Sequence, residues 1–150
     1  MSSDEETFRR LAVELRILEG TAEALQSRMN LVRAALTELR VASMTLEGVE
    51  KEKKDAPLFV PIGGGSYIKA KLGSPEQIIV GIGADVAIER TMKEARGNLE
   101  NRIAELEKTG GSLGQQLNEV VGKMQEHRTK FEAVTAKLRE RERTKSVRKA

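Results

Sequence analysis

Residues 58–72 read LFVPIGGGSYIKAKL, the stretch with the clearest local structure in the chain. It places Gly63-Gly64-Gly65-Ser66 between a short apolar run and the alternating segment Tyr67–Leu72. Glycine supplies the positive φ that tight turns need, and alternation of polar and apolar residues is typical of a strand with one covered face. The stretch therefore predicts a β-hairpin whose covered face is formed by Ile68, Ala70 and Leu72.

A second hairpin is predicted further along the chain. Gly73-Ser74-Pro75 forms a turn before Gln77–Ile82, which is β-branched and nearly uncharged, and Gly83-Ala84-Asp85 turns the chain back into Val86–Ile88. Two isolated hairpins are marginally stable in water and leave strand edges open, so the block needs strands from neighbouring chains, as in a closed barrel. The side chains predicted to drive this assembly are Phe59, Val60, Ile62, Tyr67, Ile68, Leu72, Ile78, Ile79, Val80, Ile82, Val86 and Ile88.

Two apolar stripes flank the strand block. Their residues recur at alternating gaps of three and four, which is the spacing of a coiled-coil seam. The first stripe consists of Phe8, Leu11, Leu15, Leu18, Ala22, Leu25, Met29, Val32, Leu36, Leu39, Ser43 and Leu46. The second consists of Leu99, Ile103, Leu106, Gly110, Leu113, Leu117, Val120, Met124, His127, Phe131, Val134 and Leu138. The predicted fold class is α+β, a long antiparallel coiled-coil hairpin with the two β-hairpins between its helices.

The chain is predicted to be a single domain of four segments. A first helix covers residues 4–49, with Gly48 as its stop, and the linker and both hairpins cover residues 50–88. A second helix covers residues 89–141, and a basic tail covers residues 142–150. The cluster Gly110–Gly114 either bends or breaks the second helix. We favour a continuous, bendable helix, because the apolar stripe keeps its phase across the cluster.

Composition and the absence of certain segments indicate in which cellular compartment the protein is expected. The absence of Cys is compatible with a reducing cytoplasm, and the acidic N-terminus lacks the basic-then-apolar order of a secretion signal. The longest uncharged stretch, Ala56–Ile68, is interrupted by prolines and glycines and cannot span a bilayer. We therefore expect a cytoplasmic protein without a membrane partner.

No catalytic, cofactor or metal site is predicted. Gly81-Ile82-Gly83 is followed by Val86 where a dinucleotide fingerprint needs a third small residue, and Gly63–Gly65 lacks the Lys-Ser/Thr of a phosphate loop. His127 is the only histidine, and without cysteines it cannot complete a conventional zinc site. Its seam position predicts a partly covered interface residue. The chain is therefore not expected to be an enzyme.

Aromatic residues lie near the free ends of both predicted helices. In an antiparallel pair, Phe8 at the start of the first helix and Phe131 near the end of the second come close together. The second helix is expected to extend beyond the first, which leaves Val134 and Leu138 without a packing partner on the first helix. Unpartnered apolar residues are either a frayed end or a binding surface. The binding residues predicted at these ends are Phe8, Leu11, Leu15, Phe131, Val134 and Leu138.

The C-terminal tail concentrates positive charge. Residues 139–150 carry six bases and two acids, whereas the rest of the chain is near neutral. Such a tail is either a solvated helix end or a surface for nucleic acid or an acidic protein. No aromatic residue is interleaved to stack on bases, so a nucleic-acid partner is not expected.

Two segments, Phe59–Ala70 and Val80–Glu89, resemble a known family. They are similar to the Val-Pro-(apolar)-Gly-x-Gly-Ser-(aromatic)-Ile-Lys-Ala and Val-Gly-x-Gly-x-x-(apolar) segments of the α-class subunit of prefoldin, and the resemblance extends from about Thr7 to Leu138. Asp85, where a small residue is frequent, and the tail after Leu138 depart from the pattern. The resemblance implies an archaeal type of hexamer, in which two α-class and four β-class subunits join their strands into a barrel platform.

The resemblance also implies a function. The coiled-coil ends would hold non-native client proteins without ATP and pass them to a group II chaperonin. Its implied partners are therefore β-class subunits, clients and the chaperonin. The residues alone leave an alternative open, a structural coiled-coil adaptor or tether whose basic tail binds nucleic acid.

Overall fold

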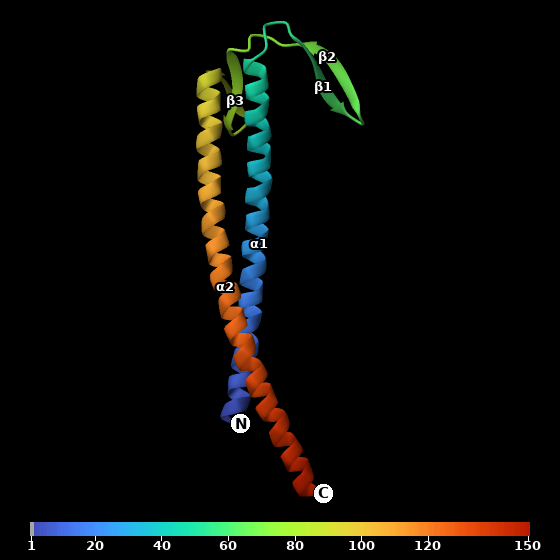
Figure 1. Ribbon diagram of the computed structural model, residues 1–150, viewed down its shortest axis with the longest axis vertical. Coiled ribbons are helices and arrows are strands. Elements are labelled where there is room, and N and C mark those ends of the chain that lie inside the picture. Colours follow the sequence, from blue (N-terminus) through green and yellow to red (C-terminus); the bar gives the residue numbers. More distant parts are fainter. Residues whose placement is uncertain (1) are drawn as a thin grey trace. The chain divides into compact units, whose positions relative to one another are not determined.

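The computed structural model describes residues 2–150 and contains six elements (Figure 1). In chain order they are α1 (Ser3–Glu50), β1 (Pro57–Gly63), β2 (Ser66–Lys71), β3 (Gln77–Gly83), β4 (Val86–Thr91) and α2 (Met92–Lys149). The chain divides into two compact units. The helical unit joins the residues up to Val32 with Thr109–Ala150, and the strand unit is Arg33–Lys108. The α+β class, with two long helices and two β-hairpins between them, is confirmed.

Side-chain caps set the starts of both helices. Ser2 Oγ accepts a hydrogen bond from the backbone N–H of Glu5 at 3.3 Å, so α1 begins slightly before its predicted start. At the start of α2, Thr91 Oγ1 accepts from the Glu94 N–H, and Glu94 Oε2 accepts from the Thr91 N–H, each at 3.2 Å. This capping box places the first residue of α2 at Met92, after β4, rather than at residue 89.

Both helices also end later than predicted. Gly48 does not stop α1, which continues to Glu50, because glycine weakens a helix without blocking its backbone hydrogen bonds. The larger correction concerns α2, which is helical to Lys149 rather than ending at residue 141. No Gly or Pro follows Gly122, and the Arg, Lys and Glu of this segment are strong helix formers. The segment predicted as a tail is therefore the last two turns of α2.

In the helical unit, the two helices pack antiparallel along the predicted seam. Leu11, Leu25 and Leu113 are buried, and no residue of the second stripe between Leu113 and Leu138 is exposed. Gly110 and Gly114 lie in the continuous helix α2, where ideal Cβ atoms would meet Val32 Cγ1 at 3.4 Å and Met29 Cε at 3.8 Å. The glycine cluster thus lies against large α1 side chains and does not break α2.

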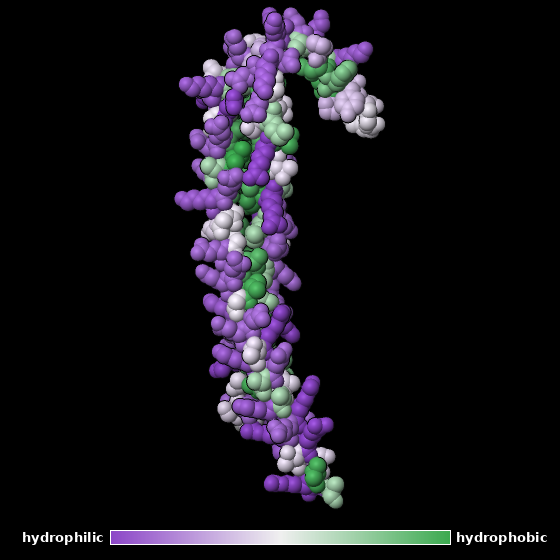
Figure 2. Space-filling model, viewed as in Figure 1, coloured by the Kyte–Doolittle hydropathy of each residue, from purple (hydrophilic) through white to green (hydrophobic). Residues whose placement is uncertain are grey.

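In the strand unit, the facing parts of α1 and α2 form a second small core. Its buried residues are Leu36, Leu39, Met92 and Ala95. Arg96 donates a hydrogen bond to the Glu50 carboxylate and forms a longer ion pair with Glu47, with 3.6 Å between Nη2 and Oε1. Arg40 Nη2 lies 2.9 Å from Glu107 Oε1. Hydrophilic side chains cover most of the helix surface seen in Figure 2, as expected for helices that bury only a narrow seam.

The strands form two separate antiparallel sheets, β1–β2 and β3–β4, as predicted. Each hairpin shifts register just before its turn, at Gly63 and at Gly83, and both glycines have positive φ. Such a bulge increases the local twist of the strands. Two residues then close each turn, Gly64-Gly65 in the first hairpin and Ala84-Asp85 in the second.

The covered face predicted for the first hairpin is only partly covered. Ala70 and Leu72 are half-buried, but Ile68 is 53% exposed. The prediction of an inward Ile68 is wrong for the single chain, because the β1–β2 hairpin stands off from the helices of its own unit (Figure 1).

Candidate functional site

The first candidate surface is the β1–β2 hairpin, which is apolar on both faces. Residues directly opposite across the strands share a face, so Val60 and Ile68 lie on one side. Phe59 and Tyr67 lie on the other, with ring centroids 6.5 Å apart in an edge-to-face arrangement. All of these side chains are exposed, and so is Ile62. A contiguous exposed apolar hairpin is typical of an interaction surface rather than of a free monomer.

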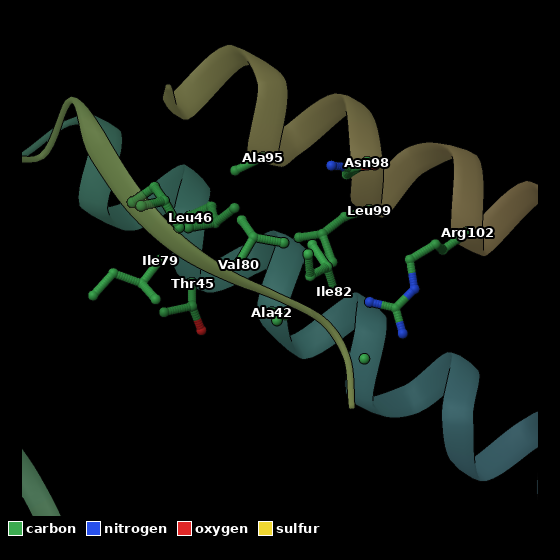
Figure 3. A pocket seen from close by; sticks show the side chains of 13 residues that line it. Ala42, Thr45, Leu46, Ile79, Val80, Ile82, Ala95, Asn98, Leu99 and Arg102 are labelled. Carbon is green, nitrogen blue, oxygen red and sulfur yellow. The ribbon is translucent and has the colours of Figure 1, made fainter. Parts of the chain in front are cut away.

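The β3–β4 hairpin has one face on the helices and one free face. Val80 and Ile88 are paired across the strands and half-buried, as is Ile78, whereas Ile79 on the opposite face is 72% exposed. Figure 3 shows Val80 and Ile82 near Leu99 in a groove of about 790 Å³ between β3 and the two helices. The groove is lined mainly by apolar side chains, with Asn98, Thr45 and Arg102 as its polar members.

These placements separate the predicted assembly residues into two groups. The exposed group presents apolar side chains to solvent and consists of Phe59, Val60, Ile62, Tyr67, Ile68, Ile79, Ile82 and Val86. The half-buried group consists of Leu72, Ile78, Val80 and Ile88. The first group can contact another chain directly, while the second holds the hairpins in place.

The second candidate surface lies at the free ends of α1 and α2 in the helical unit. The rings of Phe8 and Phe131 stack with centroids 4.8 Å apart, so the structure brings together the two aromatic residues that the sequence placed at this end. Leu11 is buried, with 3% of its surface exposed, and Leu15 is half-buried. Leu11 therefore lies in the core beneath this surface and becomes accessible to another molecule only if the helices separate.

The expected overhang of α2 begins later than predicted. Arg141 Nη2 lies 2.9 Å from Asp4 Oδ2, so the first turn of α1 reaches Arg141. Val134 and Leu138 are consequently half-buried rather than unpartnered. The prediction was wrong by about two helical turns, the distance from Val134 to Arg141, because counting residues from uncertain helix starts shifts the pairing.

Sequence reasoning missed several exposed apolar residues of α1. Val13, Ile17 and Leu31 lie off the seam in the helical unit and are each more than half exposed. The signal was present in the sequence, since Val13 and Ile17 are four residues apart and share a helical face. The regular apolar stripe predicts only the seam between the helices, and these residues lie outside it.

His127 occupies the partly covered seam position that its spacing predicted. Its Nε2 lies 2.9 Å from Glu14 Oε2, and its Nδ1 lies 2.8 Å from the carbonyl oxygen of Lys123. Within residues 2–150, no group of three His, Cys, Asp or Glu side chains is arranged to hold a metal ion. Neither of the described helices contains an apolar stretch long enough to cross a bilayer.

A pair of long helices joined by two exposed hairpins defines a class of coiled-coil assembly subunits. Residues 18–137 match the family model described as prefoldin subunit, and the chain belongs to this family. Prefoldin subunits form a family of chaperone subunits rather than of enzymes.

Curated relatives from archaea point to the α class. The chain is 31% identical over 147 residues to a prefoldin subunit alpha of Pyrococcus horikoshii, which covers 93% of this chain and 99% of the relative. It is 33% identical over 124 residues to a prefoldin subunit alpha of Methanosarcina barkeri, covering 81% and 86%.

Two solved structures share the fold. A chain of the filamentous prefoldin of Methanocaldococcus jannaschii superposes with a TM-score of 0.68 at 20% identity, covering 79% of this chain and 98% of that one. The prefoldin beta subunit of Thermococcus strain KS-1 gives a TM-score of 0.59 at 16% identity, covering 89% and 96%.

Proposed function

We propose that this chain is an α-class subunit of a cytoplasmic hexamer containing two α-class and four β-class subunits. The observation that supports this assembly is the row of exposed apolar side chains on both hairpins. Two-stranded hairpins with open edges gain stability when strands of other chains pair with them. Native mass measurement after co-expression with a β-class subunit tests the stoichiometry, and a homodimeric rod would contradict it and favour the adaptor alternative.

Within this hexamer, we propose that the free ends of α1 and α2 capture non-native proteins for transfer to a group II chaperonin. The stacked Phe8–Phe131 pair, together with the half-buried Leu15, Val134 and Leu138, offers an apolar surface at these ends. Several such ends acting on one client raise the local concentration of binding sites, which strengthens weak individual contacts.

Capture is expected to need no nucleotide. Suppression of aggregation of a denatured model protein by the hexamer should therefore be unchanged by ATP or by a chelator. Delivery is tested by adding a group II chaperonin with ATP and measuring the recovery of active client. If the hexamer alone suppresses aggregation only with ATP, this mechanism is wrong.

Truncation tests the location of capture. Removing the residues before Leu15 and after Met124 should leave the hexamer intact, because the proposed joints lie in the strand unit. Client capture should fall only partly, since four β-class subunits remain. Full capture by the truncated hexamer would place the contacts elsewhere, and loss of the hexamer would show that the helix ends are structural.

A further inference from the structure

In the helical unit, α1 carries a second apolar stripe outside the seam that it shares with α2. Its members recur at gaps of four, three, four, three and four, which is again the spacing of a coiled-coil seam. This outer stripe consists of Val13, Ile17, Gly20, Ala24, Ser27 and Leu31. All six residues are exposed, and Val13, Ile17 and Leu31 are 59%, 62% and 72% exposed. In the chain by itself, only the first seam of α1 is therefore covered by a helix.

The shape and composition of the outer stripe suit a helix as its occupant. No charged residue interrupts the stripe between Val13 and Leu31, a length of about 27 Å at about 1.5 Å per residue. Ile17, Gly20 and Ala24 also line a shallow groove of about 610 Å³ beside α2. The small side chains at Gly20 and Ala24 allow the backbone of another helix to approach closely.

Charges beside the outer stripe indicate which helix fits it. In a coiled coil, residues that flank the seam form ion pairs with the facing helix and set its identity and direction. Glu23 precedes Ala24 and Arg28 follows Ser27, so in a parallel pair of identical helices each Glu23 lies beside the Arg28 of the other copy. Both residues are exposed and, within residues 2–150, neither forms an ion pair. The two preceding flanking pairs contain no like charges, since they join Arg9 with Glu14 and Arg16 with Thr21.

The antiparallel orientation is less favourable for two copies of this helix. Aligning Val13 with Leu31 in that orientation places Glu23 beside the Glu23 of the other copy, and these like charges repel. It also places Ile17 opposite Ser27, an apolar residue against a hydroxyl. In the parallel pair, by contrast, Ile17 meets Ile17 and Leu31 meets Leu31, so the large apolar side chains cover each other.

We propose that the outer stripe of α1 packs in parallel and in register against the outer stripe of a second copy of this chain. Gly20 and Ser27 add little apolar area, so the contact is expected to be reversible. The stripe contains none of the residues proposed to contact clients or to join subunits through their strands. The proposal therefore stands apart from the proposed function and survives if client capture fails.

Disulfide crosslinking of the full-length chain by itself tests this proposal without requiring the hexamer. The chain has no cysteine, so Ser27→Cys introduces its only thiol. In the parallel pair the two thiols face each other across the stripe, and oxidation should link two copies into a species of twice the chain mass on a denaturing gel. Gln26→Cys is the matched control, because residue 26 is also exposed but is turned about 100° around the helix. It should give at least about fivefold less crosslinked product.

Charge reversal in the Ser27→Cys background tests the orientation. Glu23→Arg should lower the crosslinking yield by about fivefold, since two attractive pairs become repulsive, and adding Arg28→Glu should restore it. An antiparallel pair would not be restored in this way, because Glu23 and Arg28 would not face each other there. Circular dichroism checks that all variants keep their helix content. No crosslink at residue 27, equal crosslinking at residues 26 and 27, or failure of the second substitution to restore the yield would each overturn the proposal.

Discussion

At the scale of residues, both hairpin turns need a left-handed backbone, but they are formed by different residue types. Gly64 and Gly65 adopt φ values of 58° and 74° without steric cost, whereas Ala84 and Asp85 adopt 49° and 59°. Positive φ at both central residues defines a two-residue turn whose twist matches that of the flanking strands. Asp tolerates this region better than Ala does, so Ala84 is the most strained residue of the two turns.

Replacing Ala84 by Gly is expected to stabilise the second hairpin. The left-handed penalty of about 1–2 kcal/mol at Ala is removed, and the added flexibility of the unfolded chain offsets about 0.4–1 kcal/mol of that gain. The free energy of unfolding should rise by up to about 1.6 kcal/mol in a denaturant titration. Ala87→Gly, in β4 of the same hairpin, serves as the control and should be destabilising by about 0.5–1 kcal/mol. Equal effects of the two substitutions would show that the turn is not strained.

At the scale of elements, α2 combines a regular seam with an unusual number of glycines. Gly110 and Gly114 face Val32 and Met29 of α1, and a Cβ added at either glycine would make an ordinary van der Waals contact there. Gly111, Gly97 and Gly122 have no heavy atom within 4 Å of an added Cβ. These three glycines therefore weaken the helix without a packing benefit in the chain by itself.

Gly111→Ala is expected to stabilise α2 by about 1 kcal/mol, because alanine is a better helix former and its Cβ meets nothing. Gly110→Ala is the matched comparison, one residue away. Its Cβ would lie 3.4 Å from Val32 Cγ1, an ordinary van der Waals contact, so its gain should be at least as large as that of Gly111→Ala. Thermal unfolding followed by circular dichroism ranks the two. Destabilisation by Gly110→Ala would mean that Val32 packs closer to α2 than described.

At the scale of the whole molecule, the sequence was sufficient to predict what depends on local pattern. The heptad spacing predicted which side chains form the seam, and the glycine turns predicted two hairpins. The ends of elements were less predictable, because they depend on caps such as the Thr91–Glu94 pair and on helix propensity after Gly122. The overlap of the free ends could not be counted to better than about two turns, as the Asp4–Arg141 contact shows. The 53% exposure of Ile68 follows from the position of the β1–β2 hairpin away from the helices of its unit, which a local sequence pattern does not encode.

Assembly is predicted to depend on apolar faces of both hairpins. Ile68 and Ile79 are 53% and 72% exposed in the single chain, so Asp at both positions should leave the isolated subunit folded. In the proposed barrel the same substitutions would bury charge at a cost of several kcal/mol each. Native mass measurement after co-expression with a β-class subunit should show loss of the hexamer. Thr129→Asp with Lys130→Asp, at exposed positions of α2, is the control and should assemble normally. Normal assembly of the Ile68 and Ile79 double variant would mean that these faces are not joints.

Capture by the α-class ends is predicted to depend on the Phe8–Phe131 pair. Replacing both residues by Ala removes apolar surface, which contributes about 25 cal/mol per Å² when a client covers it. The hexamer should persist, and aggregation suppression should weaken but not vanish, because the four β-class subunits of the proposed hexamer still bind. Leu31→Ala removes a side chain that is 72% exposed but lies off the seam and away from the chain ends in sequence, so it serves as the matched loss of apolar surface. If Leu31→Ala weakens capture as much as the Phe8 and Phe131 double variant across several clients, capture follows the total exposed apolar area rather than the free ends, and the proposed site is wrong.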